Sequence, residues 1–179
     1  MNRNDYISHA LQQTRNVLGE VWECGTFKGE LALHMKLALK EFEDNRTLRI
    51  FDTFCGQPFS GPKDKHPVGS MGGVNFSEVE TKFSGMNGVY IYSGIMPNTF
   101  SGLENTKLSF TNIDVDNYDS VKACLEFVYP RTSISGWIWL DDYGCPNCPG
   151  AKIAVNEFLK GKPEIIEGPS DPCVYIIKK

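Results

Sequence analysis

The sequence predicts an α/β fold built on a mostly parallel sheet, and two observations support this. Apolar strand-like runs alternate with segments of helical period from about residue 17 to the C-terminus, an alternation that is typical of parallel sheets. The chain of 179 residues is also 41% hydrophobic and 22% charged, a size and composition that let one domain bury its own core. We therefore expect a single domain over residues 1–179, with residues 1–16 as an N-terminal helical extension.

The first part of the chain is expected to form two helices and two strands. A helix over residues 6–17 precedes a strand over residues 21–24, which ends at Gly25. A second helix follows, because four apolar side chains recur at near-helical spacing: Leu31, Met35, Leu39 and Phe42. Residues 48–51 form the second expected strand, which ends at Asp52.

The middle of the chain contains an irregular segment followed by two strands. Residues 56–76 are rich in glycine and proline, which disfavours a regular element. A connection of this length is typical of a functional loop or a mobile lid, and we expect it near the active site. The β-rich residues 89–92 and the run over residues 108–115 predict the third and fourth strands.

The last third alternates helix, strand and helix before two short strands. Tyr118, Val121, Leu125 and Val128 share one helical face, and Pro130 ends that helix. Residues 137–140 form a continuous apolar run of the kind found in strands that are buried on both faces. A helix is expected from Pro149 to Gly161. The short strands over residues 164–166 and 174–177 are close enough to pair antiparallel at the sheet edge.

Charge and hydropathy exclude several classes of partner. The formal net charge is −4 and no basic stripe occurs, so a nucleic-acid partner is not expected. The longest apolar runs fall well short of the roughly 20 residues that a membrane-spanning helix needs. The polar start of the chain lacks the features of a signal peptide. We expect a cytoplasmic protein with no membrane partner.

The six cysteines are expected to be reduced. Cys24, Cys55 and Cys124 lie in or beside apolar segments that suit a reduced core. Cys145 and Cys148 have the spacing of a redox pair or a zinc site, but zinc would need two more ligands, which leaves Cys173 and three scattered histidines. We favour plain loop cysteines, with the other two roles as alternatives.

Nearly every predicted strand ends in an acid or a glycine, and ligands of open α/β sheets bind at the carboxyl ends of strands. In the segment 23–29, two glycines allow close approach to the backbone, although the middle glycine of a dinucleotide fingerprint is missing. A tight turn that merely needs glycine is the alternative. Asp52 can accept hydrogen bonds from both ribose hydroxyls of a nucleoside, or it can form a turn.

Four carboxylates cluster after two of the predicted strands: Asp114, Asp116, Asp141 and Asp142. At adjacent strand ends they would repel one another unless a cation or a proton neutralised them. Oxygen ligands favour Mg²⁺, with Ca²⁺ or Mn²⁺ as alternatives. Some of these acids could instead cap the following helices, and Asp116 is the first candidate for that role.

The three histidines differ in their expected roles. His34 lies inside the second predicted helix, where a packed side chain is expected, and His9 is expected at the surface. His66 lies in the irregular segment, where it is a candidate base or substrate contact and otherwise a solvated side chain. The catalytic base is otherwise unassigned.

Four motifs in order resemble the macrocin O-methyltransferase family. They are VWECGTFKG at 21–29, FDTFCGQP at 51–58, IDVDNY at 113–118 and LDDYG at 140–144, and CPGAK at 148–152 adds a fifth match. The resemblance implies a Rossmann-like class I methyltransferase fold with helices on both faces of a seven-stranded, mostly parallel sheet whose last strand is antiparallel. It also implies S-adenosylmethionine and a divalent metal such as Mg²⁺ as cofactors. Known relatives methylate sugar hydroxyls on macrolide antibiotics.

The resemblance also implies the site residues. The expected metal ligands are Asp114, Asp141 and Asp142. The expected cofactor contacts are Glu23, Cys24, Gly25, Thr26, Gly29, Asp52, Thr53, Ser93, Gly94 and Asp114. The chain is shorter than typical members, so we expect an acceptor pocket that is more open or is completed by another subunit of a homo-oligomer.

The expected function is therefore metal-dependent O-methylation of a small-molecule hydroxyl, on a sugar or a glycosylated natural product. One alternative is a catechol-type phenolic O-methyltransferase, because that group shares the fold and the metal chemistry. The other is a non-catalytic nucleoside-binding protein on the same fold.

Overall fold

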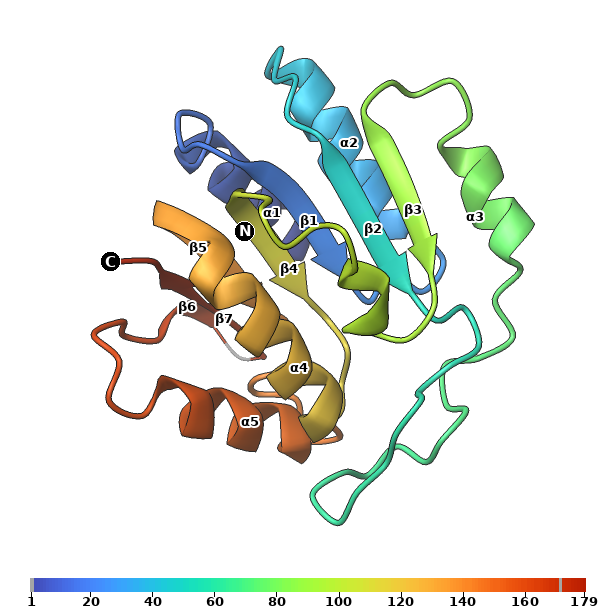
Figure 1. Ribbon diagram of the computed structural model, residues 1–179, viewed down its shortest axis with the longest axis vertical. Coiled ribbons are helices and arrows are strands. Elements are labelled where there is room, and N and C mark those ends of the chain that lie inside the picture. Colours follow the sequence, from blue (N-terminus) through green and yellow to red (C-terminus); the bar gives the residue numbers. More distant parts are fainter. Residues whose placement is uncertain (1, 171) are drawn as a thin grey trace.

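The computed structural model describes residues 2–170 and 172–179, which form one sheet with helices on both faces (Figure 1). The strands are β1 (Glu20–Cys24), β2 (Leu48–Asp52), β3 (Val89–Ser93), β4 (Leu108–Ile113), β5 (Thr132–Leu140), β6 (Glu167–Ser170) and β7 (Cys173–Ile177). The helices are α1 (Arg3–Gln13), α2 (Glu30–Glu41), α3 (Phe76–Lys82), α4 (Tyr118–Val128) and α5 (Pro149–Leu159), with short 3₁₀ turns at Asn98–Phe100 and Tyr129–Arg131.

The sheet confirms the predicted seven-stranded, mostly parallel architecture. Its strand order is β3-β2-β1-β4-β5-β7-β6. Strands β1 to β5 are parallel to one another, whereas β7 runs antiparallel to both β5 and β6. The chain leaves β1 in one direction toward β2 and β3 and then crosses to β4 on the other side of β1. This reversal is the point at which open α/β sheets bind their ligands.

Alternate side chains of the strands pack into two separate cores, one on each face of the sheet. Val21 and Ile50 pack on the face covered by α1, α2 and α3, whereas Trp22 and Phe51 pack on the face covered by α4 and α5. Figure 1 shows α4 in front of the sheet and α1 and α2 behind it. The period of two along a strand explains why neighbouring residues reach opposite cores. The Trp22 and Phe51 ring centroids lie 4.8 Å apart, which locks β1 against β2.

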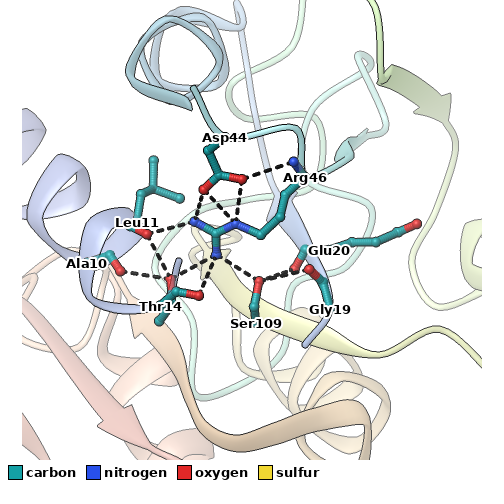
Figure 2. Close-up of polar contacts among 8 residues, drawn as sticks. All are labelled: Ala10, Leu11, Thr14, Gly19, Glu20, Asp44, Arg46 and Ser109. Carbon is teal, nitrogen blue, oxygen red and sulfur yellow. Dashed lines mark hydrogen bonds and ion pairs between the residues drawn. The ribbon is translucent and has the colours of Figure 1, made fainter. Parts of the chain in front are cut away.

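A mostly buried arginine, Arg46, joins the N-terminal helix to the sheet (Figure 2). The Arg46 guanidinium pairs with the Asp44 carboxylate at 2.7 Å. It also donates hydrogen bonds to the Leu11 carbonyl at 2.7 Å and to the Ser109 hydroxyl on β4 at 2.9 Å. The Thr14 carbonyl and hydroxyl accept further bonds at 3.0 Å. The end of α1 is thereby fixed to the start of β2 and to β4.

Several element boundaries differ from the sequence predictions. Helix α1 begins at Arg3 rather than at residue 6, because the Asn2 side chain and the Asp5 side chain cap each other's backbone N–H. Strand β6 follows the predicted residues 164–166 instead of covering them. The Glu164 carboxylate is used differently, since it accepts hydrogen bonds from the Tyr129 hydroxyl and the Lys179 N–H. Helix α3 was not predicted.

Within the described part of the chain, no helix is both long and apolar enough to cross a membrane.

Candidate functional site

A cleft of about 460 Å³ opens at the carboxyl ends of β1, β2, β4 and β5. Its lining is acidic, with carboxylates from Glu23, Glu30, Asp52, Asp114, Asp116, Asp141 and Asp142, whereas Arg3 and Lys28 supply positive charge. The arrowheads of β1 to β4 in Figure 1 point toward this edge, and the connection between β2 and α3 runs beside it. Gly56, Gln57, Pro58 and Met71 of that connection line the cleft as well.

The turn after β1 requires glycine at its first position. Gly25 has φ 86°, in the left-handed region that side chains disfavour. A Cβ atom at Gly25 would lie 1.8 Å from the Asp114 carbonyl oxygen. The backbones of the β1 and β4 ends therefore touch at this glycine.

Asp52 holds this turn in place. Its Oδ2 atom accepts hydrogen bonds from the Thr26 and Phe27 N–H groups, both at 2.8 Å. Its Oδ1 atom accepts one from the Phe54 N–H at 2.7 Å. The turn-forming role that the sequence left open is thus present. A carboxylate offers about four acceptor positions, so one remains for a ligand hydroxyl.

Glu23 is a buried acid at the base of the cleft. Its residue is 1% exposed, and the carboxylate accepts a hydrogen bond from the Thr26 hydroxyl. Burial raises the pKa of Glu23 to about 7, although the Thr26 hydrogen bond and the Arg3 charge oppose this shift. Glu23 therefore titrates close to neutral pH and is sensitive to any charge that enters the cleft.

The structure brings the three predicted metal ligands together. Carboxylate oxygens of Asp114, Asp141 and Asp142 lie within 4.8 Å of one another. Burial, followed by the charges of Asp141 and Asp142, raises the pKa of Asp114 well above its ordinary range. Burial, followed by the Asp116 charge, raises the pKa of Asp142 to about 7. The repulsion expected from the sequence is therefore present.

An arginine that the sequence analysis did not consider supplies a counter-charge. Arg3 Nη2 lies 2.6 Å from Asp114 Oδ2, and Arg3 Nε lies 2.8 Å from Asp141 Oδ1. Arg3 is the first residue of α1 and is far from these acids in sequence. No local sequence pattern predicts that it pairs with them. Three carboxylates at this spacing suit a hard divalent cation, so the donor set fits the metal. A cation bound there would compete with the guanidinium of Arg3.

The predicted cofactor contacts divide into two groups. Glu23, Gly25, Thr26, Asp52, Thr53 and Asp114 line the cleft. Cys24, Gly29, Ser93 and Gly94 are not among the described lining residues. Cys24 is buried in the core on the α4 side, and Gly29 precedes α2 in a left-handed conformation. Met96 and Ser120 line the cleft without having been predicted.

Two predicted roles near the cleft change in the structure. Asp116 does not cap α4, because its carboxylate accepts hydrogen bonds from the Gln57 side chain and the Cys148 thiol. Asp64 bonds the first turn of α4 instead, accepting a hydrogen bond from the Tyr118 N–H at 2.8 Å. His66 is absent from the described lining of the cleft, and its ring lies beside Asp116 and Cys148.

Comparison with known proteins places this geometry in context. The sequence model of the macrocin-O-methyltransferase (TylF) family matches residues 2–167. The demethyldecarbamoylnovobiocin O-methyltransferase of Streptomyces niveus is 28% identical over 156 residues, which cover 80% of this chain and 59% of that protein. The 8-demethyl-8-(2,3-dimethoxy-alpha-L-rhamnosyl)-tetracenomycin-C 4'-O-methyltransferase of Streptomyces olivaceus is 28% identical over 149 residues, or 75% of this chain and 57% of that protein.

The solved structure of the O-methyltransferase NovP has the same fold. It matches with a TM-score of 0.88 at 24% identity, covering 99% of this chain and 79% of that chain. The chain spans 59% and 57% of the lengths of the two curated relatives above.

Proposed function

The chain belongs to the macrocin O-methyltransferase family, and we propose that it transfers a methyl group from S-adenosylmethionine to a hydroxyl of a sugar or glycosylated small molecule. The proposal includes a divalent metal ion, with Mg²⁺ as the first choice, at Asp114, Asp141 and Asp142. The observation that supports the proposal most strongly is that one cleft contains a glycine turn, an acid at the end of β2 and a carboxylate triad. Nucleic acid is not part of the proposal.

The cleft suits a cationic nucleoside. S-adenosylmethionine carries a sulfonium and an ammonium group against one carboxylate, and the acidic lining of the cleft attracts net positive charge. Gly25 permits close approach to the backbone, and Asp52 keeps one acceptor position free for a ribose hydroxyl. When bound, the sulfonium supplies an activated methyl group and a neutral thioether leaving group.

The triad suits a metal that orients the acceptor. Asp114, Asp141 and Asp142 would hold the cation through oxygen ligands. When bound, the cation lowers the pKa of an acceptor hydroxyl and fixes its position. The chain contributes two further effects. Arg3 keeps Asp114 and Asp141 paired when no cation is bound, and the cleft walls restrict the acceptor so that positioning lowers the barrier.

The names of the relatives support the proposed acceptor class. The protein of S. olivaceus is named for 4'-O-methylation of a rhamnosyl tetracenomycin, and that of S. niveus for O-methylation of demethyldecarbamoylnovobiocin. The rhamnosyl group in the first name supports a glycosylated natural product as the acceptor of this chain. Phenolic diols are the comparison class in the experiment below.

The test compares methyl transfer by the wild type and two variants over a panel of sugars, glycosylated aglycones and catechols. We expect Asp141→Ala and Asp142→Ala to abolish turnover and to leave the affinity for S-adenosylmethionine within about threefold, because the metal acts on the acceptor. Asp119→Ala, an exposed acid in the first turn of α4, is the matched control and should retain activity.

Three outcomes count against the proposal. Normal turnover of both variants in the presence of a chelator would remove the metal role. Transfer confined to catechols would reassign the acceptor class. Cofactor binding without transfer to any member of the panel would favour a non-catalytic nucleoside-binding protein.

A further inference from the structure

A second group of metal-ligating side chains lies beside the cleft, where three connections meet. His66 comes from the connection between β2 and α3, Asp116 from that between β4 and α4, and Cys145 and Cys148 from that between β5 and α5. Ligand atoms of His66, Asp116 and Cys148 lie within 4.8 Å of one another. Those of Cys145, Cys148 and Asp142 do so as well. Cys148 is common to both groups.

The two cysteines sit in one turn, and the sulfurs of both lie within 4.8 Å of each other and of an Asp142 carboxylate oxygen. The Cys145 N–H donates to the Asp142 carbonyl at 3.1 Å, and the Cys148 N–H donates to the Cys145 carbonyl at 3.0 Å. Two intervening residues are the usual spacing of a cysteine pair that binds zinc. Such a pair needs two further ligands, and the fold brings them from segments that are distant in sequence.

The distance between Cys148 and Asp116 matches a shared metal ion. Cys148 Sγ lies 3.3 Å from Asp116 Oδ1. A tetrahedral zinc with bonds of about 2.3 Å to sulfur and about 2.0 Å to oxygen places those ligand atoms roughly 3.5 Å apart. The other oxygen, Asp116 Oδ2, accepts a hydrogen bond from the Gln57 side chain. This contact orients the carboxylate in the manner of an outer-shell partner of a metal ligand.

The backbone of Asp116 supports the same conclusion. Its φ is 57°, a left-handed conformation that is uncommon for residues other than glycine and that clusters at functional sites. The Asp116 N–H donates to Asp142 Oδ2 at 2.8 Å. The strained residue is thus fixed between the carboxylate triad and Cys148.

His66 is held at the group by contacts on the residues that precede it. Lys65 Nζ donates to the Pro146 carbonyl inside the cysteine turn at 2.7 Å. Asp64 accepts from the Tyr118 N–H at 2.8 Å, and a Cβ atom at Gly150 would lie 2.0 Å from Asp64 Oδ1. The connection between β2 and α3 therefore packs against α4 and α5. This packing is possible because Gly150 has no side chain to clash with Asp64.

A redox pair explains these observations less well. Reactive cysteines sit in an electropositive setting. The Cys148 thiol instead lies beside the carboxylates of Asp116 and Asp142. The six cysteines are free in the structure. A redox pair also assigns no role to His66 or Asp116.

We propose that Cys145, Cys148, His66 and Asp116 bind a structural zinc ion. His66, Asp116 and Cys148 already lie together, and Cys145, whose sulfur lies near Cys148 and Asp142, completes the site by turning its side chain toward them. Four protein ligands make a closed site of the kind that stabilises folds. Its ligands differ from those of the carboxylate triad, and Asp142 lies between the two sites. The ion cross-links the connection that carries Gln57 and Met71, which line the cleft, to the turn before α5. The zinc site thus fixes one wall of the cleft.

The test measures the zinc content of the full chain. Protein reconstituted with zinc and dialysed against a weak chelator is analysed by plasma mass spectrometry, and we expect one zinc ion per chain. Cys145→Ser, Cys148→Ser and His66→Ala should each weaken zinc binding by at least about tenfold. Cys55→Ser and His9→Ala change an exposed cysteine and an exposed histidine outside the group, and both should keep their zinc.

Cobalt and proteolysis provide readouts that need no variant. Co²⁺ in the wild type should show the thiolate charge-transfer band and the intense visible bands of a tetrahedral ion. Removing zinc with a chelator should speed tryptic cleavage after Lys63 and Lys65, which lie in the docked connection. An octahedral Co²⁺ spectrum, an unchanged cleavage rate, or a disulfide between Cys145 and Cys148 would overturn the proposal.

The zinc proposal stands apart from methyl transfer. Asp141→Ala should lose Mg²⁺ and activity but retain zinc, because Asp141 belongs to neither group around Cys148. Zinc lost equally from the two control variants, or absent from the wild type, contradicts the site whatever the activity.

Discussion

At the scale of single residues, Arg3 competes with a divalent cation for the carboxylate triad. Its guanidinium pairs with Asp114 at 2.6 Å and with Asp141 at 2.8 Å, so a divalent cation and Arg3 use the same carboxylates. The crowding of acids does not by itself require a metal ion, because the chain carries its own counter-charge. The metal and Arg3 are alternatives at one site.

Arg3→Met should therefore strengthen Mg²⁺ binding. Two partly exposed ion pairs are together worth about 1 kcal/mol, so the Kd for Mg²⁺ should fall roughly fivefold. The metal-free variant should melt at a lower temperature, and saturating Mg²⁺ should restore the loss. Thermal melts over a Mg²⁺ titration measure both effects, with Arg15→Met, an exposed arginine, as the control. An unchanged Kd would show that Arg3 does not occupy the metal position.

Glu23 makes the stability of the metal-free protein depend on pH. Burial raises its pKa from 4.5 to about 7. The protonated acid contributes stability that is fully present below about pH 4.5 and is lost as the pH rises to about 7, since the unfolded chain releases its proton first. The shift corresponds to at most about 3 kcal/mol.

Glu23→Gln should remove this dependence, because the amide stays neutral and still accepts the Thr26 hydrogen bond. The free energy of unfolding of the variant should rise relative to that of the wild type between about pH 4.5 and pH 7. Urea unfolding over this range, without metal, is the measurement. A difference between the two proteins that is constant with pH would contradict the burial of an ionisable acid at this position.

Alanine substitutions at Gly25 and Gly85 distinguish the cost of backbone strain from the cost of a steric clash. Both have a positive φ, 86° and 76°, but only the Cβ position of Gly25 clashes, since nothing lies within 4 Å of that of Gly85. Gly85→Ala should cost about 1–2 kcal/mol from conformation alone. Gly25→Ala should cost at least about 2 kcal/mol more and should abolish cofactor binding. Equal losses in denaturant melts would mean that the ends of β1 and β4 do not touch.

The site residues that the sequence could predict share one property. Glu23, Asp52, Asp114 and Asp141 each stand at the end of a strand, and a parallel sheet brings such ends to one edge. Arg3 could not be predicted, because its bond to Asp114 joins positions 111 residues apart. The proximity of His66 to Cys148 could not be predicted for the same reason, since it depends on how an irregular connection folds back.

At the scale of elements, local periodicity predicted those that are long or strongly apolar. Helix α4 begins at Tyr118 and ends at Val128, as its apolar stripe and Pro130 indicated. Helix α3 has 7 residues and one buried side chain, Val79, which is too few to show a helical period. Strand β6 was placed three residues early because Ile165 and Ile166 resemble a strand, although Ile165 is exposed.

The hydrogen bonds of Arg46 should stabilise the packing of α1 on the sheet. Arg46→Leu removes the charged partner of the nearly buried Asp44 carboxylate, which keeps only the backbone N–H of residue 46, and frees the end of α1, which should cost about 3–5 kcal/mol. Arg15→Leu, on the exposed surface, should cost less than about 0.5 kcal/mol. Urea unfolding of both variants tests the difference. Similar small losses would show that the network in Figure 2 does not hold α1 to the sheet.

At the scale of the whole molecule, the order β3-β2-β1-β4-β5-β7-β6 explains where the chemistry lies. The reversal between β1 and β4 opens the cleft, and the strand ends on both sides supply its acids. The fold class followed from the alternation of strands and helices together with the family motifs. The sequence did not predict the acceptor, because the walls of its pocket depend on connections whose packing leaves no periodic pattern in the sequence.

The central claim is a cleft that binds S-adenosylmethionine beside a divalent metal. Calorimetric titration of S-adenosylmethionine into the purified protein, with and without Mg²⁺, tests it most directly. We predict saturable binding at one site in both conditions, and loss of that binding in Gly25→Ala. Absence of any heat of cofactor binding by the folded wild type would contradict the claim.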